Sequence, residues 1–207
     1  SRRTRVSEHS DKNIGDDFAF ETQVIHAGQN PDPTTGAVTT PIYQVSTYAQ
    51  LSAGVHKGYD YSRTANPTRT ALEDCVASLE GGKHGYAFAS GMAAADAVLR
   101  QLAPGDTIVL GNDAYGGTYR LVSGIYERAG CNWVALDLTD IDVLKREWPT
   151  GAKLVWLETP TNPGLRIVDI EAVAEIAHER DALCVVDNTF ATPYLQKPLE
   201  YGADVVV

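Results

Sequence analysis

Two short segments of the chain combine hydroxyl, glycine and guanidinium groups at spacings that could bind an anion. Ser90-Gly91-Met92 follows an apolar run and opens an Ala-rich, helix-forming stretch. The free N–H groups and the positive dipole end at the start of a helix favour a phosphate. Upstream, Arg63 can donate two hydrogen bonds to a phosphate and Tyr61 can donate a third. The simpler alternatives are an N-cap serine in a tight turn and a surface Tyr–Arg pair.

Three further polar residues stand where predicted strands end. Tyr115 precedes two glycines and could offer its ring to a planar ligand. Asn162 lies in a loop that Pro160 and Pro163 stiffen, so its side chain could be aimed. Asp187 ends an apolar run, and a carboxylate buried there is costly unless it is paired. The alternatives are a surface tyrosine, an asparagine chosen for turn geometry and an aspartate that caps a loop.

The elements that must position these residues alternate between short apolar strands and helices from Tyr59 onward. This alternation, with apolar runs buried on both faces, indicates an α/β fold with a mostly parallel sheet. Ligands of such sheets bind at the carboxyl ends of the strands, which is where the candidate residues fall. In the last helix, Ile170, Val173, Ile176 and Ala177 share one face. We expect strands at 84–89, 107–110, 132–136, 153–157, 183–186 and 203–207, and helices at 68–79, 92–102, 118–128, 140–148 and 169–180.

The N-terminal quarter of the chain has a different character. Residues 1–17 are polar and charged, and we expect them to be disordered. Residues 18–58 have no sustained period and carry several prolines, which predicts an extended arm that lies on another part of the protein. The sequence therefore predicts an arm over 1–58 and a domain over 59–207.

The composition is that of an ordinary globular protein, with 43% hydrophobic and 21% charged residues in a chain of 207. The formal net charge of −10 argues against nucleic-acid binding through phosphate neutralisation. Cys75, Cys131 and Cys184 lie far apart, so we expect reduced, mostly buried thiols and no metal site. The basic N-terminus lacks a following apolar segment, and no apolar run reaches the ~20 residues of a membrane helix. We expect a soluble cytoplasmic protein that binds no membrane.

Five segments in the right order resemble the signatures of the Cys/Met-metabolism family of enzymes that depend on pyridoxal 5'-phosphate (PLP). A ligand with a phosphate, a flat ring and a basic ring nitrogen would use all five, and PLP is such a ligand. The resemblance runs from about Phe20 to Val207. The segments are Tyr61-Ser62-Arg63 with Asn66-Pro67-Thr68, Ser90-Gly91-Met92-Ala93-Ala94, Tyr115-Gly116-Gly117-Thr118, Glu158-Thr159-Pro160-Thr161-Asn162-Pro163 and Val185-Val186-Asp187-Asn188-Thr189-Phe190.

The resemblance implies a fold and a role for each site residue. The fold is the aspartate-aminotransferase-like PLP-dependent transferase fold (fold type I), with helices on both faces of the sheet and an extended N-terminal arm. Residues 59–207 are then the first part of the large PLP-binding domain. By resemblance, Ser90, Gly91 and Met92 bind the PLP phosphate, and Tyr61 and Arg63 reach the phosphate of a neighbouring subunit's cofactor. The resemblance also implies that Tyr115 stacks on the pyridine ring and moves protons, and that Asp187 pairs with the pyridine nitrogen. It places Asn162 near the cofactor's phenolic oxygen and the substrate carboxylate, with Thr189 as a further candidate nearby.

The resemblance also implies parts that this sequence does not contain. The family's Schiff-base lysine lies in a Ser-x-Thr-Lys segment a few residues after the strand at 204–207. None of Lys12, Lys57, Lys83, Lys145, Lys153 and Lys197 has that position. We therefore expect this chain to be the N-terminal half of the enzyme and to be inactive by itself. The resemblance further implies a homotetramer, built as a dimer of dimers with shared active sites.

The expected reaction is γ-replacement or γ-elimination on small amino-acid substrates of sulfur metabolism. Cystathionine γ-synthase, which joins O-succinyl- or O-acetylhomoserine to cysteine, is the favoured activity, and cystathionine γ-lyase is the alternative. Methionine γ-lyase is less favoured because Gly117 stands where those enzymes usually carry a cysteine. O-acetylhomoserine sulfhydrylase is a further alternative. A hypothesis from another class is a non-catalytic binding protein that kept the fold and lost the lysine.

Overall fold

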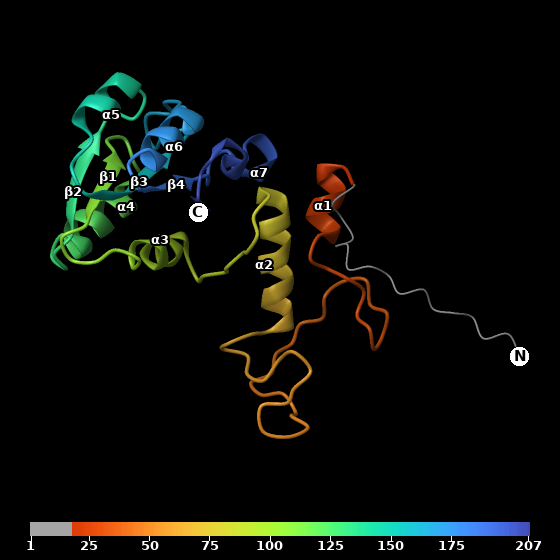
Figure 1. The fold of residues 1–207 in the computed structure, drawn as a ribbon. Coiled ribbons are helices and arrows are strands. Elements are labelled where there is room, and N and C mark those ends of the chain that lie inside the picture. The colour runs from red at the N-terminus through yellow and green to blue at the C-terminus, as the bar shows by residue number, and fades with distance from the viewer. Residues whose placement is uncertain (1–17) are drawn as a thin grey trace, which may run out of the picture. The chain divides into compact units, whose positions relative to one another are not determined.

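A computed structural model describes residues 18–207, so the expected disorder of residues 1–17 lies outside the described range. The chain divides into two compact units, one ending at Ala87 and one beginning at Phe88 (Figure 1). This division follows packing within the chain. The predicted boundary between an arm of 1–58 and a domain of 59–207 concerns functional parts, and it stays a prediction.

The unit from Phe88 to Val207 is built around a sheet of five strands in the order β2-β1-β3-β4-β5. All neighbouring strands run parallel, which confirms the α/β sheet predicted from the alternation of elements. The predicted strands at 107–110, 132–136, 153–157 and 183–186 are present, and the one expected at 203–207 is short. The strands are β1 (Thr107–Gly111), β2 (Asn132–Leu136), β3 (Ala152–Glu158), β4 (Leu183–Asp187) and β5 (Val205–Val206).

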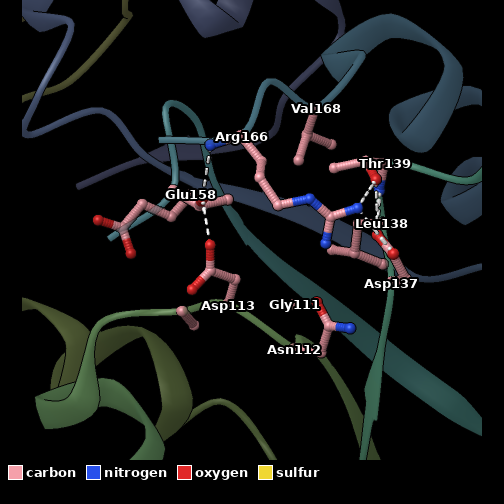
Figure 2. A pocket seen from close by; sticks show the side chains of 11 residues that line it. Gly111, Asn112, Asp113, Asp137, Leu138, Thr139, Glu158, Arg166 and Val168 are labelled. Atoms are coloured by element: carbon pink, nitrogen blue, oxygen red, sulfur yellow. Dashed lines mark hydrogen bonds and ion pairs between the residues drawn. The ribbon is translucent and has the colours of Figure 1, made fainter. Parts of the chain in front are cut away.

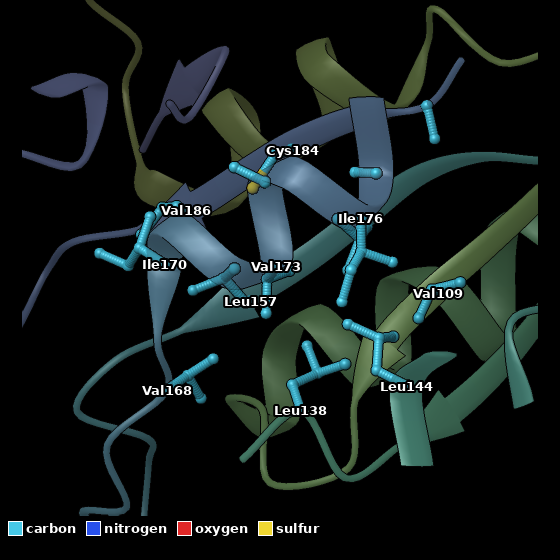
Figure 3. Packing of buried hydrophobic residues seen from close by; sticks show 14 of the residues in the cluster. Val109, Leu138, Leu144, Leu157, Val168, Ile170, Val173, Ile176, Cys184 and Val186 are labelled. Atoms are coloured by element: carbon cyan, nitrogen blue, oxygen red, sulfur yellow. The ribbon is translucent and has the colours of Figure 1, made fainter. Parts of the chain in front are cut away.

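Helices cover both faces of this sheet because successive strand side chains point to opposite faces. Ile108 and Trp156 belong to one buried cluster, together with Leu99 of α3 (Gly91–Leu99). Residues one position further along the same strands belong to a second cluster with α5 (Ile141–Glu147) and α6 (Ile170–His178). Figure 3 shows this second cluster, in which Val109, Leu157 and Val186 of the strands meet Val173 and Ile176 of α6.

Polar side chains fix where the main helices of this unit begin. Asp140 accepts from the Asp142 and Val143 amides at the start of α5, and Asp169 accepts from the Ala172 amide at the start of α6. The buried face predicted for α6 is confirmed. The remaining elements are α4 (Gly116–Leu121), a π-helix (Val122–Tyr126), α7 (Thr192–Leu195) and a 3-10 helix (Pro198–Tyr201).

The unit that ends at Ala87 contains α1 (Phe20–His26) and α2 (Pro67–Glu80), which pack on each other. Asn66 caps α2 by accepting from the Thr68 amide, and Gly81 ends it in the left-handed region at φ 72°. Helix α2 confirms the helix predicted at 68–79. Helix α1 was not predicted, because seven residues are too few to establish a helical period within the expected arm.

Two sequence predictions in this part of the fold are wrong. Residues 84–89 form no strand, because no strand within 18–207 pairs with them. The edge strands of the sheet are β2 and β5. The single helix expected over 118–128 is divided into α4 and the π-helix. The wider turn leaves Tyr126 buried, where its hydroxyl donates to the Asp96 carboxylate at 2.9 Å.

The three cysteines of residues 18–207 have free thiols. Cys131 and Cys184 are buried, Cys75 is partly exposed, and none of them forms a disulfide. No His, Cys, Asp and Glu side chains in this range group in a way that could hold a metal ion. The helices within the same range are all too short or too polar to cross a membrane.

Candidate functional site

The start of α3 presents unused hydrogen-bond donors. Ser90 caps the helix, because its hydroxyl oxygen accepts from the Ala93 amide at 3.1 Å. Within residues 18–207, the Gly91 and Met92 amides donate to no protein acceptor. A Cβ at Gly91 would meet no atom within 4 Å, so the space beside this turn is open. Both readings of Ser90-Gly91-Met92 are therefore compatible: the serine is an N-cap, and the next two amides remain available to an anion.

The Tyr115 ring lies against the first turn of α4. A Cβ at Gly117 would overlap the ring at Cε1 and would stand 2.8 Å from the Met92 sulfur. Gly117 is buried, and 42% of the Tyr115 surface remains exposed. The structure thus brings Met92, Tyr115 and Gly117 together, and the close approach of the ring requires a residue without a side chain at position 117.

Asp187 is the last residue of β4. One of its carboxylate oxygens accepts hydrogen bonds, and the other has no described partner. Thr189 donates to Asp187 Oδ1 from its hydroxyl at 2.6 Å and from its amide at 3.1 Å. Within residues 18–207, Asp187 Oδ2 accepts no hydrogen bond and no cation forms an ion pair with it. Thr189 therefore orients the carboxylate, and the free oxygen can accept from a ligand.

Asn162 is the predicted site residue that the structure links least to the others. Its side chain is partly exposed and makes no hydrogen bond within the described part of the chain. The loop that carries it is nevertheless held in place. Thr159 accepts from the Val168 amide and from the Gln196 side chain, each at 3.0 Å, and the Thr161 hydroxyl donates to Asp113 at 2.6 Å.

Glu158 is a residue that sequence reasoning did not include among the site residues. It ends β3, it is only 5% exposed, and its carboxylate accepts from the Tyr115 amide at 2.8 Å. It pairs in register with Asp187 on β4. Burial raises the pKa of Glu158 to about 7, the Tyr115 amide lowers it, and the charges of Asp187 and Asp113 raise it further. Its position after a buried apolar strand, the argument applied to Asp187, was the signal available.

The raised pKa of Glu158 predicts how the free energy of unfolding depends on pH. The folded protein keeps a proton on Glu158 that the unfolded chain, with an ordinary pKa of 4.5, releases. The free energy of unfolding should therefore lose this contribution as the pH rises from 4.5 to about 7. Glu158→Gln removes the titration, so its stability relative to the wild type should increase over this window.

Urea unfolding of the two proteins at several pH values between about 5 and 8 measures this difference. Glu171→Gln, which changes an exposed glutamate of α6, is the control and should follow the wild type. A stability difference between Glu158→Gln and the wild type that stays constant with pH would contradict the prediction.

The strand ends also form a small pocket that contains none of the predicted site residues. Its volume is about 10 Å³, close to the lower limit for one water molecule. Arg166 closes it by donating to Asp137 at 2.8 Å and to Thr139, and Glu158 lines its other side (Figure 2). In Figure 2 the Glu158 carboxylate points away from the Arg166 guanidinium. This pocket is too small for a coenzyme, so the open surface beside Gly91 and Tyr115 is the better candidate site.

Tyr61 and Arg63 belong to the unit that ends at Ala87. The Arg63 guanidinium lies over the Tyr61 ring, 4.5 Å from its centroid. Tyr61 pairs with Thr47 in an antiparallel bridge, and Arg63 is exposed. The two residues are therefore brought together on a loop that leads into α2, with the guanidinium accessible.

Comparison with known proteins gives consistent matches to one family. The family described as Cys/Met metabolism PLP-dependent enzyme matches residues 21–207. Cystathionine beta-lyase of Coxiella burnetii is 55% identical over 188 residues, which are 90% of this chain and 49% of that protein. A probable cystathionine gamma-synthase of Herpetosiphon aurantiacus is 48% identical over 191 residues, 92% of this chain and 60% of that protein.

The solved structures agree with the sequence matches. The crystal structure of cystathionine gamma-lyase from Lactobacillus plantarum, complexed with L-serine, matches with a TM-score of 0.88 and 48% identity. The match covers 91% of this chain and 49% of that one, so this chain spans about half the length of such relatives. These similarities confirm the expected fold and the resemblance, inferred from the five motifs, to a family of PLP-dependent enzymes. The relatives differ in the activity that their names give, and each name refers to cystathionine.

Proposed function

Because the chain belongs to the Cys/Met metabolism PLP-dependent enzyme family, we propose that it is part of an enzyme that forms or cleaves cystathionine. The relatives named above carry out three different reactions, and cystathionine is the compound common to their names. When bound, PLP withdraws electrons from the substrate's Cα. The residues of this chain would bind and orient the cofactor and control its protonation.

The observation that carries the proposal is that the unit from Phe88 to Val207 holds three groups suited to contacts with PLP. The Gly91 and Met92 amides are unused donors at a helix start, which suits the phosphate. The exposed Tyr115 ring, fixed against Gly117, suits a flat pyridine ring. The free oxygen of Asp187 suits a protonated ring nitrogen. The residues present therefore fit PLP.

The face of the sheet toward which the Asp187 side chain points supports this assignment. Leu157 and Val186 belong to the cluster with α5 and α6, so the next residues on β3 and β4, Glu158 and Asp187, point to the opposite face. That face carries α3, whose Leu99 packs with Trp156. Asp187 is therefore directed toward the side of the sheet on which the donors of α3 are found.

The remaining predicted residues are assigned by the family resemblance together with their accessibility. Asn162 has a side chain that no described residue engages, which leaves it free for a cofactor oxygen or a substrate carboxylate. The accessible guanidinium of Arg63 and the Tyr61 hydroxyl would complete the phosphate site of a neighbouring subunit. Thr189 would act through Asp187, by holding Oδ1 so that Oδ2 faces the ring nitrogen.

Among the reactions, we retain cystathionine γ-synthesis as the first candidate. Gly117, which the Tyr115 ring requires, disfavours methionine γ-lyase because those enzymes usually carry a cysteine at this position. Cystathionine β-lyase is the second candidate, and the specific observation in its favour is the 55% identity with the Coxiella burnetii protein. Cystathionine γ-lyase remains the alternative that uses the same compound in the breakdown direction.

Product identification with the full-length protein separates these candidates. O-succinyl- or O-acetylhomoserine with cysteine gives cystathionine if the protein is a γ-synthase. Cystathionine and water give cysteine, 2-oxobutanoate and ammonia by γ-elimination, or homocysteine, pyruvate and ammonia by β-elimination. Mass spectrometry of the two incubations therefore assigns the reaction. PLP binding without any of these products would favour the non-catalytic alternative.

The contact between Tyr115 and Gly117 gives a second test. Gly117→Ala places a methyl group in the space of the Tyr115 ring, so the ring should move and PLP should bind less tightly, by about tenfold or more. Titration of the full-length apoenzyme with PLP, followed by absorbance, measures the effect. Gly124→Ala is the matched control, since a Cβ there meets no atom within 4 Å. Unchanged PLP affinity in Gly117→Ala would remove Tyr115 from the proposed site.

A further inference from the structure

Glu158 lies where three elements meet at the carboxyl edge of the sheet. It extends from β3, accepts from the first residue before α4, and lies beside β4 through the register of Glu158 with Asp187. Among residues 18–207 no Lys, Arg or His forms an ion pair with it. Its described partner is therefore a backbone amide, that of Tyr115.

A buried carboxylate without a cation is unfavourable, so stability alone does not explain a glutamate at this position. Two nearby carboxylates make the position less favourable still, because the charges of Asp187 and Asp113 raise the pKa of Glu158. An apolar residue would fill the end of β3 as well. What an apolar residue lacks is an acceptor for the Tyr115 amide, which is at the N-cap position of α4.

Helix α4 begins after Tyr115 without a polar side chain that caps it. Asp140 and Asp169 cap α5 and α6 with their own carboxylates, whereas Tyr115 makes no side-chain cap. The hydrogen bond from its amide to Glu158 fixes the backbone at this point instead. Because the ring direction follows from the backbone of Tyr115 and its contact with Gly117, this bond also restricts the ring.

We propose that Glu158 is a positioning residue, which holds the Tyr115 ring at the cofactor site by accepting the Tyr115 backbone N–H from the end of β3. The inference rests on the proposed function, because it takes Tyr115 as the residue that stacks on PLP. It also assigns a reason for a carboxylate or amide at position 158. The group required there is a hydrogen-bond acceptor in a buried position, and its charge is secondary.

The test compares Glu158→Ala, which removes the acceptor, with Glu158→Gln, which keeps an acceptor of the same length. PLP affinity of the full-length apoenzyme and the visible circular dichroism of the bound cofactor are measured. The second readout reports the asymmetry of the ring environment and does not depend on turnover. Thr139→Val, which removes a hydrogen bond to Asp137 at another strand end, is the matched control for a lost polar contact.

We expect Glu158→Ala to raise the dissociation constant for PLP about tenfold and to reduce the visible dichroism, as loss of one fixing contact predicts. Glu158→Gln should restore both toward wild-type values, and Thr139→Val should leave both unchanged. Native affinity and dichroism in Glu158→Ala would overturn the inference, and so would a Gln variant as defective as the Ala variant. A wild-type protein that binds no PLP would instead refute the proposed function.

Discussion

Asp187→Ala should remove most of the activity of the full-length enzyme, by about 100-fold or more. The reason is electrostatic: a protonated ring nitrogen makes the cofactor an electron sink, and the carboxylate at the end of β4 would hold that proton by charge pairing. The geometry favours this role, because Thr189 occupies Oδ1 and leaves Oδ2 without a described partner. Steady-state rates with the substrate identified by the product assay measure the loss.

Two companion variants make the result specific. Asp142→Ala changes an exposed aspartate in the first turn of α5 and should retain normal rates. Thr189→Val keeps the Asp187 carboxylate but removes the hydroxyl that orients it, so its loss of activity should be smaller than that of Asp187→Ala. Near-normal turnover in Asp187→Ala would show that the assigned role of this carboxylate is wrong.

Local pattern was sufficient to predict the parts of the fold whose signal is contained in one segment. The apolar runs of β1, β3 and β4 and the one-sided face of α6 are visible in the sequence, and the structure has all of them. Residues 84–89 have the composition of a strand, yet a strand exists only if another strand pairs with it. No described strand does so, and a single segment contains no information about its partner.

The residues of the candidate site also differ in whether the sequence alone could identify them. Ser90, Tyr115 and Asp187 were found because each follows an apolar run, and their chemistry suits the end of a strand or the start of a helix. Glu158 satisfies the same rule and was missed as a site residue, because its importance comes from contacts that the sequence does not display. These are the register with Asp187 and the hydrogen bond from the Tyr115 amide, which depend on how β3 lies beside its neighbours.

Arg63→Ala should weaken PLP retention without unfolding the protein, because the lost hydrogen bonds would belong to the ligand and not to the core. Arg63 is exposed, and its described ring contact is with Tyr61 on the same loop. If the site is shared between subunits, as we propose from the family resemblance, Arg63 completes the phosphate site of a partner whose own Asp187 binds the ring nitrogen. Dialysis of the full-length holoenzyme, followed by cofactor absorbance, measures retention.

Mixing two defective variants, after dialysis has removed the weakly held PLP, tests whether Arg63 acts across the interface. A dimer of one Arg63→Ala subunit and one Asp187→Ala subunit has one site with both residues intact and one site with both missing. With random exchange, half of the dimers are mixed and half of their sites are intact, so activity should return to about one quarter of the wild-type value. If Arg63 instead serves its own subunit, every site keeps one defect and no activity returns. Absence of recovery, with subunit exchange shown by native mass spectrometry, would therefore place Arg63 in its own subunit's site.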